Sequence, residues 1–155
     1  MVEKLLLSSA LNKAMALCAG REMCRHDMMQ KLISWGISHD NIDLILKQLT
    51  EGKFIDEERY ALAFSKDKFR YNKWGKLKIS AGLRMKKIPG DIISRALGSI
   101  DETDYLELLK SIIARQQKTV RAKNQYDLKG KILRHCLSKG FESHLIYELL
   151  GEVGG

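Results

Sequence analysis

Apolar residues recur along the first third of this chain at spacings of three and four, which is the period of an amphipathic α-helix. One such run covers residues 5–19, a second extends from about Arg25 to Trp35, and a third follows Ser38 or Asp40. Gly36 directly follows the second run, where a residue in the left-handed conformation commonly ends a helix. The pattern predicts three amphipathic helices. The side chains expected to face inward are Leu7, Leu11, Ala14, Leu17, Cys18, Met28, Met29, Leu32, Ile33, Ile42, Ile45, Leu46 and Leu49.

The same apolar pattern occurs twice more, first 51 residues and then a further 53 residues along the chain. The corresponding residues are Ile37, Ile42, Ile45 and Leu46; Ile88, Ile93, Ala96 and Leu97; and Phe141, Ile146, Leu149 and Leu150. Upstream of them, the corresponding pairs are Met28 and Leu32, Ile79 and Leu83, and Ile132 and Cys136. An all-α chain of three tandem three-helix repeats is therefore predicted, over residues 5–52, 54–99 and 103–151. Because each unit presents an apolar face that a neighbour covers, we expect the repeats to form an elongated, curved helical body.

The ends of the middle helices differ between the repeats. Gly36 and Gly140 occupy corresponding positions, but Lys87 stands between them in the second repeat. The same tight turn is therefore not predicted there, although Pro89 is well suited to begin the helix that follows.

Positive charge is concentrated in the middle of the chain, which has a formal net charge of +8 as a whole. Residues 66–87, the first basic segment, contain nine basic residues and one acid, Asp67, whereas the remainder of the chain carries eighteen residues of each sign. The nine are Lys66, Lys68, Arg70, Lys73, Lys76, Lys78, Arg84, Lys86 and Lys87. Solvated helix faces usually interleave both signs, so a block of one sign favours contact with a polyanion.

Membrane, disulfide and metal chemistry have little support in the sequence. It contains no run of 18 or more apolar residues, as a membrane span requires. The three cysteines form no Cys-x-x-Cys pair and leave one unmatched in any disulfide scheme, which favours a reducing compartment. Cys24 with His26, and His135 with Cys136, lack the spacing of a zinc finger. We therefore expect a cytoplasmic protein that uses no metal or cofactor.

An ordered set of motifs carries a family resemblance. Residues 54–64 (FIDEERYALAF) are followed by 68–70 (KFR) and by 74–79 (WGKLKI), and together with 21–32 (REMCRHDMMQKL) they resemble the RecX family. Cys24 stands where the family usually has a serine that caps a helix, and Lys87 stands where it commonly has glycine. The resemblance covers nearly the whole chain. The motif residues to which it gives a structural role are Phe54, Ile55, Asp56, Arg59, Tyr60 and Phe64.

The resemblance implies a regulator that binds RecA–DNA filaments and mostly inhibits the ATPase, strand-exchange and coprotease activities of RecA. It implies roles in recombination, DNA repair and the SOS response, with the RecA filament and DNA as partners. We also expect no membrane partner and a monomeric state. The expected contact residues are Lys66, Arg70, Lys73, Trp74, Lys76, Lys78, Arg84, Lys86 and Lys87. Two alternatives stay open, a helical protein that binds DNA by itself and a scaffold for another protein. An enzyme is the poorest hypothesis, because no glycine-rich nucleotide loop, His-Glu-x-x-His motif or nucleophile elbow is present.

The aromatic residues of the motif have two interpretations. Tyr60, Phe64 and Phe69 lie at helical spacing and are expected to pack in the core. Trp74 lies between Lys73 and Gly75 at a predicted loop-to-helix turn. There it is equally suited to stack on a base and to cover the interface between two repeats.

Overall fold

A computed structural model describes residues 2–154 of the chain, with the side chains of residues 6–151. These residues form nine α-helices and no strand, which confirms the all-α prediction. The helices are α1 (Val2–Gly20), α2 (Arg25–Ser34), α3 (His39–Glu51), α4 (Glu57–Arg70), α5 (Lys76–Met85), α6 (Gly90–Gly98), α7 (Glu102–Thr119), α8 (Gln125–Ser138) and α9 (Ser143–Gly154).

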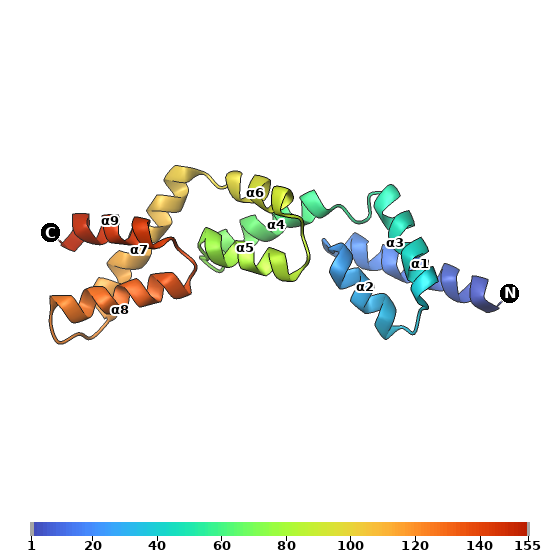
Figure 1. The fold of residues 1–155 in the computed structure, drawn as a ribbon, viewed down its shortest axis with the longest axis horizontal. Coiled ribbons are helices and arrows are strands. Elements are labelled where there is room, and N and C mark those ends of the chain that lie inside the picture. The colour runs from blue at the N-terminus through green and yellow to red at the C-terminus, as the bar shows by residue number, and fades with distance from the viewer. Residues whose placement is uncertain (1, 155) are drawn as a thin grey trace.

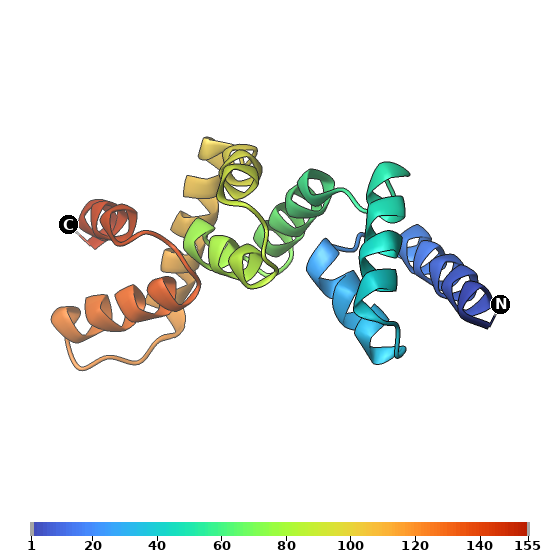
Figure 2. The same cartoon turned by 45° about the vertical axis from the view of Figure 1, so that its right-hand side comes forward.

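The helices lie in groups of three along one axis, and Figure 1 shows the groups following one another from the N-terminal to the C-terminal end. The view in Figure 2 shows the same order, so the molecule is elongated. Two of the helices begin at an aspartate that caps them, as their sequences suggest. Asp56 accepts a hydrogen bond from the Arg59 N–H at 3.0 Å, and Asp101 accepts one from the Asp104 N–H at 2.9 Å.

The second turn has the geometry that its sequence did not predict, because Lys87 adopts the same left-handed backbone as the two glycines. The φ angle is +77° at Gly36, +61° at Lys87 and +94° at Gly140. Each turn is closed by the same backbone hydrogen bond, which the Ile88 N–H donates to the Leu83 carbonyl at 3.2 Å in the second repeat. The three turns therefore share one geometry, and lysine bears the conformational cost that glycine avoids.

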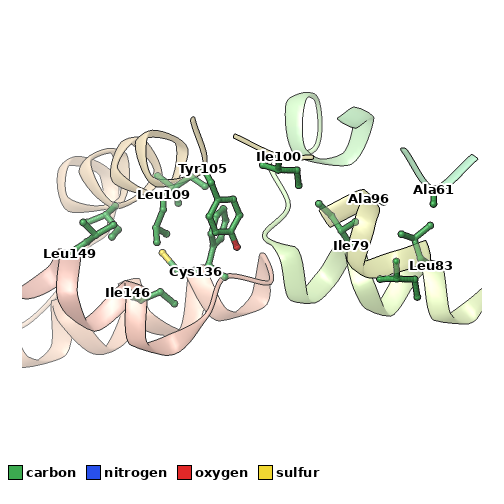
Figure 3. Close-up of a cluster of buried hydrophobic side chains, with 14 of the residues drawn as sticks. Ala61, Ile79, Leu83, Ala96, Ile100, Tyr105, Leu109, Cys136, Ile146 and Leu149 are labelled. Atoms are coloured by element: carbon green, nitrogen blue, oxygen red, sulfur yellow. The ribbon is translucent and has the colours of Figure 1, made fainter. Parts of the chain in front are cut away.

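Two buried clusters form the core among the residues whose side chains are described. The cluster of the first helix group contains residues such as Met28, Leu32 and Ile45, whereas the second and third groups share one continuous cluster. Figure 3 shows part of the shared cluster, with Leu109 and Leu149 on one side of Tyr105 and Ile79 and Leu83 on the other. The repeat pattern located this core, because the corresponding residues Met28, Ile79 and Ile132 are all fully buried. One inward assignment was wrong, since Ile33 is 47% exposed.

The second and third helix groups meet through a close approach of two backbones. The Gly75 N–H donates to the Lys139 carbonyl at 2.7 Å, and the Leu77 N–H donates to the Gly140 carbonyl at 3.0 Å. A Cβ atom at Gly75 would lie 2.4 Å from the Gly140 carbonyl carbon. The aromatic-glycine step before α5 is therefore explained by packing, because only a glycine lets these backbones touch.

Candidate nucleic-acid interface

The motif at residues 54–64 builds the connection between the first two helix groups. Ile55 is buried in the first core cluster, and Phe54 packs against the same cluster. The Arg59 guanidinium binds Glu22 at 2.7 and 2.8 Å and donates to the carbonyls of Lys53 and Phe54. Arg59 thus fastens α4 to the loop before it and to the segment that joins α1 and α2.

Trp74 is half-buried and belongs to an aromatic row on the second helix group. Its ring meets Phe64 edge-on at a centroid distance of 6.4 Å, and Phe64 in turn contacts Tyr60 at 5.9 Å. The Lys68 and Lys78 ammonium groups lie 4.9 and 4.7 Å from the Trp74 ring centroid. Tyr60 is buried and Phe64 is half-buried, as expected of core residues. These contacts favour the interpretation of Trp74 as a cover over the core, because the Lys68 and Lys78 ammonium groups already lie over the ring on which a base would stack.

Four of the nine basic residues of the first basic segment are engaged within the chain. Lys76 pairs with Glu102 at 3.5 Å, and Lys86 pairs with Asp27 at 2.9 Å. Lys78 donates to the Ser138 carbonyl at 3.4 Å, and Lys68 lies over the aromatic row. All four are half-buried, so their charge is partly used in holding neighbouring elements together.

The other five, Lys66, Arg70, Lys73, Arg84 and Lys87, are exposed and take part in no ion pair among the described residues. Three of them line two different pockets. Lys66 and Arg70 line a pocket of about 510 Å³ between α4 and α7, together with the acids Asp101, Asp104 and Glu107. Lys73 turns instead toward the third helix group, where its neighbours are basic.

The sequence analysis missed a second basic segment. Acidic residues elsewhere in the chain balance its charge when all residues outside 66–87 are counted together. Residues 110–139 contain nine basic residues and one acid, Asp127, so this stretch is as one-sided as the first basic segment. The nine are Lys110, Arg115, Lys118, Arg121, Lys123, Lys129, Lys131, Arg134 and Lys139. A count of charge in successive windows would have found it. Tyr126 lies within this segment and is 90% exposed.

The two basic segments meet where the second and third helix groups join. A pocket of about 530 Å³, the junction pocket, is lined by Lys73, Ser111, Ile112, Arg115, Gln116, His135 and Lys139. Lys139 donates to the Asn72 carbonyl at 2.8 Å, which places its ammonium group beside the turn that carries Lys73. Burial, and the nearby charges of Lys78 and Lys73, lower the pKa of Lys139. The junction is therefore strongly positive.

Metal and membrane chemistry find no support in the described part of the chain. No group of three or more His, Cys, Asp or Glu side chains among these residues is arranged to hold a metal ion. None of the helices described is long and apolar enough to cross a membrane. The three cysteines are free thiols.

The fold and the charged surface together define a helical-repeat protein with a basic junction, and comparisons with known proteins identify its family. Residues 56–97 match the model of the second three-helix domain of RecX, and residues 102–150 match that of the third. The chain is 31% identical over 148 residues to the Regulatory protein RecX of Chlorobaculum tepidum, covering 96% of this chain and 90% of that protein. It is 28% identical over 145 residues to the Regulatory protein RecX of Prosthecochloris aestuarii, covering 93% of each chain. The chain belongs to the RecX family.

Solved structures show the same fold. The crystal structure of RecX from Lactobacillus salivarius superimposes with a TM-score of 0.86 at 22% identity, and the match covers 96% of each chain. A second crystal structure, described as regulatory protein RecX, also gives a TM-score of 0.86 and covers 94% of this chain and 71% of that one. The fold class predicted from the sequence is thereby confirmed.

Proposed function

We propose that this protein binds the filament that RecA forms on DNA and restrains the ATP hydrolysis, strand exchange and coprotease activity of RecA. Family membership and relatives named Regulatory protein RecX support the proposal. The observation that carries it is structural: two basic segments of one sign converge at a junction in an elongated body. Such a body suits a partner that is long, grooved and rich in negative charge.

A RecA–DNA filament fits this description because it displays acidic side chains and encloses phosphates. Clustered lysines and arginines attract such a surface over a distance that salt limits to about 10 Å at 0.1 M ionic strength. Tyr126, exposed in the second basic segment, adds an aromatic face on which an unpaired base can stack. DNA contact is therefore part of the proposal, with the exposed members of both basic segments as the contact residues.

The remaining parts of the proposal concern how the protein acts in the cell. The chain acts by binding rather than by catalysis, as a monomer in the cytoplasm. Its role lies in DNA repair, recombination and the SOS response. The lysines engaged within the chain, such as Lys76 and Lys86, serve mainly to position elements.

The DNA-dependent ATP turnover of RecA tests the proposal when this protein is titrated into preformed filaments. Turnover should fall at equimolar or lower ratios of this protein to RecA. Unchanged turnover at an equimolar ratio would refute inhibition of RecA. Mobility of single-stranded DNA with and without RecA separates the alternatives, since a protein directed at DNA alone shifts naked DNA and leaves RecA turnover unaffected.

A variant of the first basic segment tests the charge mechanism. Lys66→Gln, Arg70→Gln and Arg84→Gln together remove three exposed charges that have no ion-pair partner among the described residues. Each change should alter stability by no more than about 0.5 kcal/mol. The concentration needed for half-inhibition of RecA turnover should rise, and the increase should be larger at low salt. Inhibition at wild-type concentrations would show that these residues lie outside the interface.

A further inference from the structure

The two junctions between helix groups differ in charge at corresponding positions of the repeat. At the first junction, Lys86 binds Asp27 at 2.9 Å, so a basic side chain is neutralised by an acid. The repeat offsets place Lys139 at the position of Lys86 and Lys78 at the position of Asp27. At the second junction a lysine therefore replaces the acid that neutralises the first.

The junction pocket lies beside this unneutralised pair. Lys73, Arg115, His135 and Lys139 are its basic lining residues, and the described residues that line it include no aspartate or glutamate. They come from the turn before α5, from α7 and from the end of α8. Its volume of about 530 Å³ falls within the range of sites that hold small ligands or parts of larger ones.

Positive groups held together without an acid repel one another. The lowered pKa of Lys139, caused by burial and by the charges of Lys78 and Lys73, is consistent with this repulsion. An anion in the pocket would offset it. Arg115 is exposed and has no ion-pair partner among the described residues, and its planar guanidinium offers paired N–H donors that suit phosphate oxygens. Ser111 and Gln116 add neutral donors to the same lining.

We propose that the junction pocket binds a phosphate of a nucleic-acid backbone through Lys73, Arg115 and Lys139. The pocket is the main DNA-binding site of the protein. A backbone fits better than a free anion because both basic segments lead away from the pocket. Beyond Arg115, the second basic segment continues through the exposed residues Lys118, Arg121 and Lys123, which provide contacts for further phosphates. The inference deepens the proposed function by assigning the DNA site to the junction.

The test measures binding of a fluorescein-labelled oligothymidylate by anisotropy between 50 and 200 mM salt, and it uses no RecA. The proposed inhibition of RecA and the proposed binding of DNA at the junction are therefore tested separately, and either one can be refuted without the other. The junction variant combines Lys73→Gln with Arg115→Gln, two exposed positions. The matched control combines Arg21→Gln with Lys47→Gln, which removes one guanidinium and one ammonium from exposed positions of the first helix group.

The wild-type protein should bind, and the junction variant should bind roughly tenfold more weakly at 0.1 M salt. The slope of log affinity against log salt should become shallower by about 0.7, because the pocket holds one phosphate and each phosphate contact to a single strand contributes about 0.7. The control should stay within about twofold of wild type. Lys78→Asp, which copies the first junction, should weaken binding as well, and Arg115→Gln alone should show a smaller loss.

Circular dichroism establishes that each variant is folded. If the double variant does not fold, Arg115→Gln alone replaces it in the binding measurement. Wild-type affinity in a folded junction variant would overturn the proposal, as would an equal loss in the control. Absence of wild-type binding to the oligonucleotide would overturn it too. Poly-glutamate is the final comparison. If it binds the wild type while the oligonucleotide does not, the pocket is a site for carboxylates of a protein partner rather than for phosphates.

Discussion

Alanine substitutions at two equivalent glycines should separate backbone strain from contact between helix groups. Gly36 and Gly140 both have positive φ angles, +77° and +94°, at corresponding helix ends. A Cβ atom at Gly36 would meet no atom within 4 Å. A Cβ atom at Gly140 would lie 2.3 Å from the Lys78 Cβ and 2.5 Å from the Lys78 backbone nitrogen, and backbone atoms cannot turn away as a flexible side chain can.

The two variants should therefore differ in stability. The left-handed conformation costs an alanine about 1 kcal/mol at either position. Overpacking at Gly140 adds about 1–3 kcal/mol, because α5 and the turn before α9 must move apart. Gly36→Ala should lower the free energy of unfolding by about 1 kcal/mol and Gly140→Ala by about 2–4 kcal/mol. In a chain of this length, the melting temperature should fall by about 2–4 °C and about 4–16 °C respectively.

Thermal and urea denaturation followed by circular dichroism at 222 nm would measure both variants against wild type. Gly140→Ala should also show its largest effect on the third helix group, because repeat proteins are stabilised by contacts between neighbours. Equal losses in the two variants would refute the argument from close approach. They would show that conformational strain alone accounts for the glycine at the second junction.

Three further predictions concern stability. Phe64→Ala should cost about 2–3 kcal/mol in urea denaturation, less than for a fully buried ring, because the side chain is half-buried; a change near zero would place the ring on a binding surface. Lys87→Gly should stabilise the protein by about 1 kcal/mol, since glycine removes the strain of a φ angle of +61°; lower stability would contradict that geometry. Burial raises the pKa of the Cys24 and Cys136 thiols from about 9 to about 11, so the folded state favours the protonated form. The unfolded chain releases these protons first, and the free energy of unfolding should therefore fall between pH 9 and pH 11; a Cys24→Ser, Cys136→Ala variant should show a smaller fall.

The core was predictable from the sequence because burial follows the helical period. Met28, Ile79 and Ile132 are equivalent in the repeat pattern, and all three are fully buried. Asp56 was predictable as a helix cap because capping is also local. Its side chain accepts a hydrogen bond from the Arg59 N–H, only three residues further along the chain. Ile33 shows the limit of this local argument. It follows the period of α2 but is 47% exposed, because the period does not fix how far around a helix its neighbours reach.

The candidate site was less predictable because it depends on contacts between distant residues. Lys73 and Lys139 lie far apart in the sequence and meet only when two helix groups pack. The charge count also treated all nine residues of the first basic segment alike, although Lys76 and Lys86 have acidic partners in other groups. The turn at Lys87 was not predicted for a related reason, since the repeat imposes one backbone geometry even where the side chain disfavours it.

Packing and charge at the second junction depend on the same backbone contact. The hydrogen bond from the Gly75 N–H to the Lys139 carbonyl, 2.7 Å long, holds the turn that carries Lys73 against the end of α8. Gly140→Ala forces these elements apart and should therefore weaken binding of the oligothymidylate, although it removes no charge. The junction charge variant Lys73→Gln with Arg115→Gln should also lose binding, but it should keep wild-type stability within about 1 kcal/mol. Measuring stability and binding on both variants at a temperature where each is folded tests this coupling. If Gly140→Ala binds the oligonucleotide as wild type does, the spacing of the two backbones is not what creates the positive pocket.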